Sequence, residues 1–159
     1  MASPVQNNQP LQLLVGIDVG STTAKIAVMD AASHEVLMRR YVRHHAQQAN
    51  CLKSLLAELD QQFGGIPMRA ALCGSGGAAL AEALNLPYVQ EVVANSLAVG
   101  ANYPTARTAI ELGGQDAKMI FFKFDNEANC LSVADMRMNG SCAGGTGAFI
   151  DEIASLLRT

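Results

Sequence analysis

The sequence predicts an α/β protein in which one sheet-and-helix unit is followed by the opening of a second unit of the same kind. Two observations lead to this prediction. The expected elements run β-β-β-α-β-α-α and then β-β-β-α, and a glycine-rich strand–turn–strand segment opens each series. The composition, with 50% hydrophobic and 16% charged residues, is that of a folded chain and decides against disorder.

The elements of the first unit follow from the spacing of its apolar residues. Residues 1–10 are polar, with two prolines, and are expected to form a flexible tail. Apolar or alternating runs bounded by turn residues predict four strands, at 11–18, 25–30, 35–42 and 69–73. Helical spacing or an alanine-rich composition predicts three helices, at 52–63, 78–84 and 92–101. The pair Gly64-Gly65 is expected to end the first helix in a left-handed conformation.

The second unit begins after Pro104. Three further strands are predicted, at 108–112, 117–124 and 130–136. The helix that follows has its apolar residues on one face and is expected to carry Asp151 and Glu152 in its first turn, where they suit the helix dipole. The expected domains are therefore a tail at 1–10, a first unit at 11–105 and the start of a second at 106–159. Because the second unit is incomplete, the chain is expected to be the N-terminal part of a longer protein, or a truncated protein.

Charge and cysteine content exclude several classes of function. The chain has 11 Lys and Arg against 14 Asp and Glu, a net charge of −3, so it lacks the basic surface that nucleic acids or membranes attract. No apolar stretch approaches the roughly 18 residues that a spanning helix needs. The first ten residues do not resemble a secretory signal, and the four cysteines lack CxxC spacing, which favours reduced thiols. These features predict a soluble cytoplasmic protein.

Two hairpins carry the pattern of a phosphate site. Residues 16–25 (GIDVGSTTAK) and 111–118 (ELGGQDAK) each have a carboxylate at a strand end, a glycine two positions on, and then a lysine. Glycine allows backbone N–H groups to approach a phosphate, serine and threonine add hydroxyl donors, and lysine adds a positive charge. Ordinary turns rich in small residues are the alternative. The recurrence of the pattern 93 residues later, again after an apolar strand, favours the phosphate site.

The acidic and polar turn residues are candidates for metal binding and catalysis. Carboxylates bind Mg²⁺ directly or through water, and a glutamine can orient an attacking water. The predicted catalytic residues are Asp18, Gln115 and Asp116, and the predicted Mg²⁺ ligands are Asp18 and Asp116. The predicted nucleotide-binding residues are Gly16, Asp18, Gly20, Ser21, Thr22, Thr23, Lys25, Glu111, Gly113, Gly114, Gln115, Asp116, Gly144, Gly145 and Thr146.

Two other glycine-rich segments carry weaker signals. Residues 73–77 (CGSGG) do not complete GxGxxG and are expected to pack a strand closely onto a helix. Residues 140–145 (GSCAGG) have the glycine spacing of a P-loop, but Thr146-Gly147 follows where a lysine is required, so a Walker A motif is rejected. The N–H groups that open the following helix can still bind a phosphate.

These segments, with MNGSCAGGTGAFID at 138–151, resemble the ATPase activators of 2-hydroxyacyl-CoA dehydratases and the ATPase subunits of benzoyl-CoA reductases. The resemblance covers about residues 11–158. It implies the ribonuclease H-like fold of the actin, sugar kinase and heat-shock chaperone superfamily, with ATP or ADP and Mg²⁺ as ligands. It also implies a homodimer that shares one [4Fe–4S] cluster, for which Cys142 matches one ligand. Such a protein uses ATP to pass an electron from a reduced ferredoxin or flavodoxin to a dehydratase or related reductase component.

Two departures from the family pattern leave other functions open. Glu111 stands where the superfamily usually has aspartate, and the family's second cysteine ligand and its adenosine-binding segment have no match in this chain. The chain alone is therefore not expected to be a competent ATPase. A sugar-kinase-like or chaperone-like ATPase without a cluster is one alternative, and a non-catalytic remnant is another.

The remaining cysteines, histidines and aromatic residues are expected to be structural. Cys73 and Cys130 lie in apolar strands and are expected in the core, and Cys51 is expected to be structural. Solvated surface positions are expected for His34, His44 and His45. A second group is expected to fill the sheet core: Phe121, Phe122, Phe124, Met136 and Met138.

Overall fold

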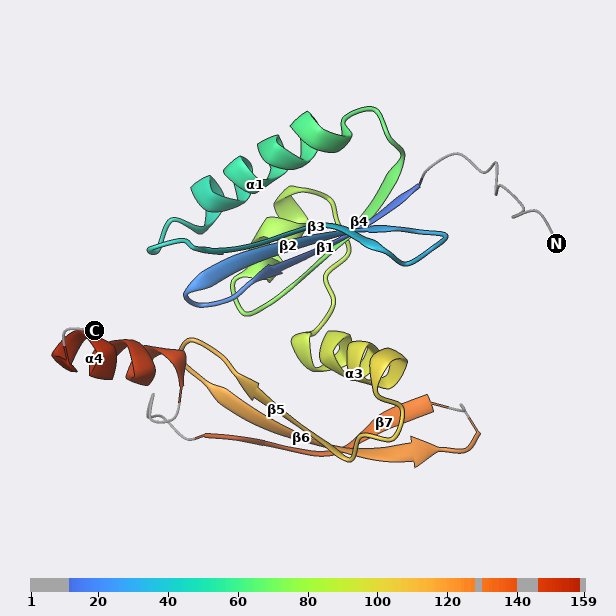
Figure 1. The fold of residues 1–159 in the computed structure, drawn as a ribbon, viewed down its shortest axis with the longest axis vertical. Helices are drawn as coiled ribbons and strands as arrows, with labels where there is room; N and C mark the ends of the chain where they lie inside the picture. The colour runs from blue at the N-terminus through green and yellow to red at the C-terminus, as the bar shows by residue number, and fades with distance from the viewer. Residues whose placement is uncertain (1–11, 128–129, 140–145, 158–159) are drawn as a thin grey trace, which may run out of the picture.

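The computed structural model describes residues 12–127, 130–139 and 146–157 (Figure 1). Every predicted strand and helix is present there. The elements in chain order are β1 (Leu13–Val19), β2 (Thr23–Asp30), β3 (Val36–Arg43), α1 (Gln48–Phe63), β4 (Met68–Cys73), α2 (Gly77–Ala83), α3 (Glu91–Asn102), β5 (Thr108–Leu112), β6 (Ala117–Asp125), β7 (Cys130–Met138) and α4 (Gly147–Leu157). The largest shift in the first unit is the start of α1, four residues before the predicted Leu52, because a polar first turn gives no apolar spacing.

The first unit is a four-stranded sheet in the order β3-β2-β1-β4. Strand β1 is antiparallel to β2 and parallel to β4, so the chain crosses over through α1 before it adds β4. One face of the sheet is apolar because buried residues alternate along β1. Helices α1 and α2 cover this face, with Leu52, Leu55 and Leu59 of α1 and Ala81 of α2 in the core (Figure 1).

The opposite face of the first sheet has small side chains at its centre. Ala71, Gly16 and Ala27 lie side by side on β4, β1 and β2 in the strand register. Helix α3 lies between this face and the second sheet (Figure 1). A groove of about 790 Å³ remains between the small residues and α3, with Ala94 and Leu97 on the helix side. The hollow follows from the lack of large side chains on three adjacent strands.

The second sheet is antiparallel, in the order β5-β6-β7. Phe122 on its central strand is buried, as predicted for the sheet core, and Ile120 on the same strand is buried too. The same prediction is wrong for Phe124, Met136 and Met138, which are exposed. Edge positions explain the two methionines, because β7 pairs with β6 alone among the described strands.

Helix α4 differs from the sequence prediction at its start. It begins at Gly147, so Asp151 and Glu152 lie in the second turn and not, as predicted, in the first. Asp151 instead forms an ion pair with Arg43 at the end of β3, which links α4 to the first unit. The apolar side chains of α4 are exposed in the described structure. None of the described helices is long and apolar enough to cross a membrane.

The end of α1 also differs in detail. Gly64 caps the helix with φ −54°, so it is not left-handed, whereas Gly65 is, with φ +81°. The predicted left-handed residue is therefore the second of the two glycines. An L-residue at Gly65 would be strained by this positive φ.

Candidate functional site

The turns of the two hairpins face each other. Gly114, in the β5–β6 turn, lies against Thr22, in the β1–β2 turn. A Cβ atom added at Gly114 would lie 2.2 Å from Thr22 Oγ1, so only glycine fits there. Residues that are 92 positions apart in the sequence thus form one site, as the repeated motif predicts.

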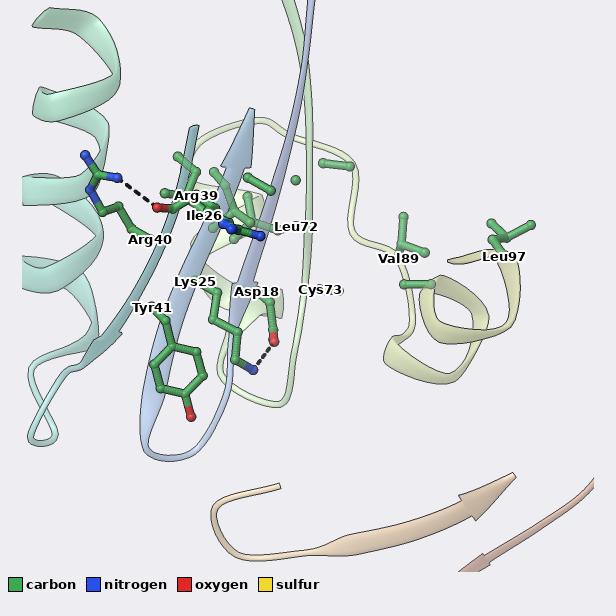
Figure 2. A pocket seen from close by; sticks show the side chains of 15 residues that line it. Asp18, Lys25, Ile26, Arg39, Arg40, Tyr41, Leu72, Cys73, Val89 and Leu97 are labelled. Atoms are coloured by element: carbon green, nitrogen blue, oxygen red, sulfur yellow. Dashed lines mark hydrogen bonds and ion pairs between the residues drawn. The ribbon is translucent and has the colours of Figure 1, made fainter. Parts of the chain in front are cut away.

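The first hairpin pairs its carboxylate with its own lysine. Asp18 and Lys25 are cross-strand partners on β1 and β2, and Lys25 Nζ donates to Asp18 Oδ2 at one end of the groove (Figure 2). Burial alone would lower the pKa of Lys25, but the hydrogen bond and charge of Asp18 outweigh it and raise the pKa. The other oxygen, Asp18 Oδ1, is buried and has no hydrogen-bond partner among the described residues. A buried carboxylate oxygen of this kind is available to a further donor.

The β1–β2 turn presents backbone donors. The Gly20 N–H donates to Thr23 O at 2.9 Å and closes the turn. Within the described ranges, no acceptor is bonded to the N–H groups of Ser21 or Thr22. Gly16 is placed differently from the other predicted residues, because it lines the floor of the groove and not the turn. The backbone donors that this turn leaves without an acceptor are therefore those of Ser21 and Thr22.

The second hairpin contains a buried lysine that joins three carboxylates. Lys118 is 7% exposed, and its Nζ lies 2.8 Å from Asp116 Oδ2, 3.0 Å from Glu91 Oε2 and 3.4 Å from Glu111 Oε1. Lys118 and Glu111 are cross-strand partners, like the acid and lysine of the first hairpin. Asn95 Nδ2 donates to Glu111 Oε2 at 2.8 Å. Helix α3, which carries Glu91 and Asn95, is thereby tied to the second hairpin.

The pKa shifts in this network show that the charges depend on one another. Burial alone would lower the pKa of Lys118, but hydrogen bonds with Asp116 and Glu91 and the charge of Glu111 outweigh it and hold the pKa above its usual value. The pKa of Glu111 is raised, first by burial and then by the nearby Glu91 carboxyl. Lys118 is therefore the shared cation whose positive charge offsets the charges of these carboxylates.

Helix α4 starts directly at the second turn. The N–H groups of Gly147 and Ala148 donate to the carbonyls of Gly113 and Gly114, each at 2.9 Å. These two helix donors are thus already used, which leaves fewer of them for a phosphate than the sequence suggests. Thr146 is fully buried at this junction. The other predicted residues of this loop, Cys142, Gly144 and Gly145, lie outside the described residues.

The remaining predicted residues of the second turn are placed at its surface. Gln115 is exposed, and Asp116 is half-buried beside Gly113, where a Cβ would approach Asp116 Oδ1 to 2.3 Å. An exposed amide at the point where the two turns meet can reach a bound ligand. The structure thus brings the first turn and residues 111–116 together.

Sequence reasoning missed three residues of the site, Glu91, Asn95 and His44. Glu91 and Asn95 are polar and lie four residues apart on a mostly apolar helix, a spacing that places them on one face and could have identified them. The prediction that His44 is a solvated surface residue is wrong, because it is 4% exposed. No feature of the local sequence distinguishes His44 from His45, which is exposed as predicted.

The cysteines in the described ranges do not form a cluster site. Cys51, Cys73 and Cys130 are free thiols, and no group of three His, Cys, Asp or Glu side chains in these ranges could hold a metal ion. Burial, followed by the charges of Asp18 and Glu91, raises the pKa of Cys73 to about 11. Cys130 is exposed, so its predicted core position is wrong; it begins the edge strand β7. The described cysteines therefore do not fit a [4Fe–4S] cluster, whereas the free oxygen of Asp18 fits a water of a nucleotide-bound Mg²⁺.

Comparison with known protein families shows to which family the chain belongs. The model described as the BadF/BadG/BcrA/BcrD ATPase family matches residues 15–159. The chain belongs to this ATPase family. The match includes both hairpins and the segment that leads into α4, so the resemblance inferred from these glycine-rich segments is confirmed.

Several relatives of the chain are named as dehydratase activators. The (R)-2-hydroxyglutaryl-CoA dehydratase activating ATPase of Acidaminococcus fermentans is 26% identical over 145 residues, which are 91% of this chain and 53% of that protein. The crystal structure of component A of that dehydratase matches with a TM-score of 0.74 at 25% identity, over 92% of this chain and 54% of that one.

A second solved structure shows the same fold. The activator of the 2-hydroxyisocaproyl-CoA dehydratase from Clostridium difficile, with bound ADPNP, matches with a TM-score of 0.69 at 24% identity, over 92% of this chain and 53% of that one. The predicted fold class, a ribonuclease H-like sheet unit followed by the first strands and helix of a similar unit, is confirmed. The chain spans about half the length of the relatives it matches.

Proposed function

We propose that the chain carries the ATP-binding part of an activator that delivers electrons to a 2-hydroxyacyl-CoA dehydratase or a related CoA-ester reductase. The observation that supports this most is the contact between the two acid-x-Gly turns at Thr22 and Gly114. One relative is named an activating ATPase of such a dehydratase, and another activator was solved with ADPNP. A nucleotide between the two turns would meet donors from both hairpins at once.

The residues of the first hairpin would bind the phosphates. The free N–H groups of Ser21 and Thr22 donate to phosphate oxygens, and Lys25 exchanges Asp18 for a phosphate. Asp18, released from Lys25, then accepts a hydrogen bond from water on the nucleotide's Mg²⁺. This exchange keeps each charge paired in both states, so binding leaves no buried ion without a partner.

The residues of the second hairpin would complete the site. Asp116 holds a second water of the Mg²⁺, and the exposed amide of Gln115 orients the water that attacks the terminal phosphate. Mg²⁺ itself neutralises charge on the phosphates during hydrolysis. Lys118 keeps Asp116 and Glu111 in place from behind the turn.

The electron-transfer role of the proposal depends on Cys142. A cysteine in this loop would be one ligand of a [4Fe–4S] cluster, with further thiolates from elsewhere in the activator and from a second subunit. Reduced ferredoxin or flavodoxin would supply the electron, and the dehydratase component would receive it. Relatives named as activators of 2-hydroxyacyl-CoA dehydratases support this partner.

Nucleotide binding can be tested by calorimetry with Mg-ATP. Asp18→Asn should weaken binding at least tenfold, because it removes the charge that both Lys25 and the Mg²⁺ waters use. The control is Asp60→Asn on the exposed side of α1, which should bind like the unmodified chain. Equal affinities for the two variants would refute the placement of the nucleotide at the hairpins.

The cluster role needs a separate test. Anaerobic reconstitution of the full-length activator that contains this chain, with iron and sulfide, should give a brown [4Fe–4S] chromophore that Cys142→Ser abolishes. Cys130→Ser, which changes an exposed thiol away from this loop, should leave the chromophore unchanged. If reconstitution gives no chromophore while Mg-ATP still binds, the electron-transfer role is wrong and an ATPase without a cluster remains.

A further inference from the structure

The buried residue His44 lies against the β1–β2 turn and forms two hydrogen bonds with its carbonyl groups. It follows strand β3 directly and is 4% exposed. Its backbone N–H donates to Thr22 O at 3.2 Å, and its ring nitrogen Nε2 lies 3.1 Å from Gly20 O. His44 therefore contacts the first and last carbonyls of the three-residue turn from Gly20 to Thr22.

The hydrogen bonds of the ring assign its tautomer. Ala46 N–H donates to Nδ1 at 3.2 Å, so Nδ1 is the nitrogen without a proton. The proton is then on Nε2, which donates to Gly20 O. His45 and Ala46 both have positive φ, 48° and 61°, a conformation that L-residues rarely adopt. Two such residues in succession turn the chain back so that the Ala46 N–H reaches the ring.

A hydrogen bond that fixes the direction of a carbonyl group also fixes the direction of the N–H group of the next residue. In a trans peptide the C=O and the following N–H are coplanar and point in opposite directions. The bond from His44 to Gly20 O therefore sets the direction of the Ser21 N–H, which has no acceptor among the described residues. An N–H group that is already aimed loses little entropy when it binds a phosphate.

We propose that His44 is a positioning residue of the phosphate site: its Nε2–H holds Gly20 O so that the Ser21 N–H points at the phosphates. This inference rests on the proposed nucleotide site and adds to it a residue that does not contact the ligand. It explains why the chain buries a neutral imidazole beneath an exposed turn. The adjacent His45, which is exposed, has no such role.

Three variants test this proposal: His44→Ala, His44→Gln and His45→Ala. Calorimetry would measure the affinity for Mg-ATP and for Mg-tripolyphosphate, which probes the phosphate site alone. His44→Ala should weaken both ligands by the same factor, about tenfold, as expected for the loss of one positioned donor. His44→Gln should recover most of the affinity because its amide N–H can replace Nε2–H. His45→Ala should bind like the unmodified chain.

A second measurement tests the turn without any ligand. Amide hydrogen exchange at Gly20, whose N–H closes the turn onto Thr23 O, should be faster in His44→Ala than in His45→Ala, and ¹⁵N NMR should show a protonated Nε2 and an unprotonated Nδ1 on His44. Equal Mg-ATP affinities in His44→Ala and His45→Ala, with the unmodified chain binding, would overturn the positioning role and leave the proposed function intact. Failure of the unmodified chain to bind either ligand would overturn both, whatever the exchange rates show about the turn.

Discussion

Replacing Lys118 with methionine should destabilise the protein strongly, because this lysine is the cation shared by three carboxylates. Its Nζ lies 2.8 Å from Asp116, 3.0 Å from Glu91 and 3.4 Å from Glu111. Methionine has a similar length and keeps the apolar contacts of the lysine stem. The substitution therefore removes the positive charge and leaves the packing of the side chain largely unchanged.

The expected magnitude follows from burial. Removing one partner of a fully buried ion pair costs about 3–5 kcal/mol. Lys118 is 7% exposed, but the carboxylates of Glu91, Glu111 and Asp116 are 27%, 23% and 39% exposed, so water screens part of the charge that remains. We expect a loss of about 2–3 kcal/mol, which lowers Tm by about 5–10 °C in a chain of this size.

The assay is thermal unfolding at several pH values, with Lys123→Met as the control. Lys123 is an exposed lysine on the same strand, so its replacement should change stability by less than about 0.5 kcal/mol. The pKa of Lys118 is raised in the folded state, so its stabilising effect is complete below the ordinary lysine pKa and is lost only in strong base. In Lys118→Met the pKa of Glu111, which is already raised, rises further because its cation is gone, and protonation of Glu111 relieves the repulsion as the pH falls towards about 5. A destabilisation that is the same at about pH 5 and pH 8 would refute the electrostatic explanation.

Two further predictions concern packing and thiol reactivity. Gly114→Ala should destabilise the protein by about 1–3 kcal/mol and weaken Mg-ATP binding, because its Cβ would lie 2.2 Å from Thr22 Oγ1. Gly100→Ala, where an added Cβ meets only Leu131 Cβ at 3.7 Å, is the control for both thermal unfolding and calorimetry, and equal effects would contradict the contact between the turns. Cys73, with a pKa of about 11, has roughly one thiol in a thousand ionised at about pH 8, so iodoacetamide should modify the exposed Cys130 before Cys73 in a mass-spectrometric time course.

The parts of the site that the sequence predicted are those fixed over short distances along the chain. In each hairpin a carboxylate ends one strand and a lysine seven positions later lies on the next, so a tight turn makes them cross-strand partners. The motif predicts that each acid and lysine share a hairpin, although not that they form the ion pairs Asp18–Lys25 and Glu111–Lys118. The repeat of the motif predicted that the two turns act together, although not that Thr22 and Gly114 would be in contact.

The residues that the sequence did not reveal depend on contacts between distant elements. His44 is buried because strand β3 ends beside the β1–β2 turn, and a pattern of alternating residues cannot report which turn lies next to a strand end. Glu91 becomes part of the site because α3 lies between the two sheets (Figure 1). The exposed methionines of β7 were mispredicted for a similar reason, since composition does not show which face of a sheet another element covers.

The net negative charge around the two turns leads to a last prediction, that ATP binds tightly only as its Mg²⁺ complex. Four carboxylates and two ammonium groups gather there: Asp18, Glu91, Glu111, Asp116, Lys25 and Lys118. Their formal charges sum to −4 + 2 = −2, so the site repels the free triphosphate of ATP. Mg²⁺ bound to the phosphates reduces that charge and gives the free oxygen of Asp18 a partner through water. Calorimetry in the presence of EDTA should therefore show affinity for ATP at least tenfold below that for Mg-ATP. Similar affinities with and without the metal would mean that the carboxylates face away from the phosphates and serve only to bind the lysines.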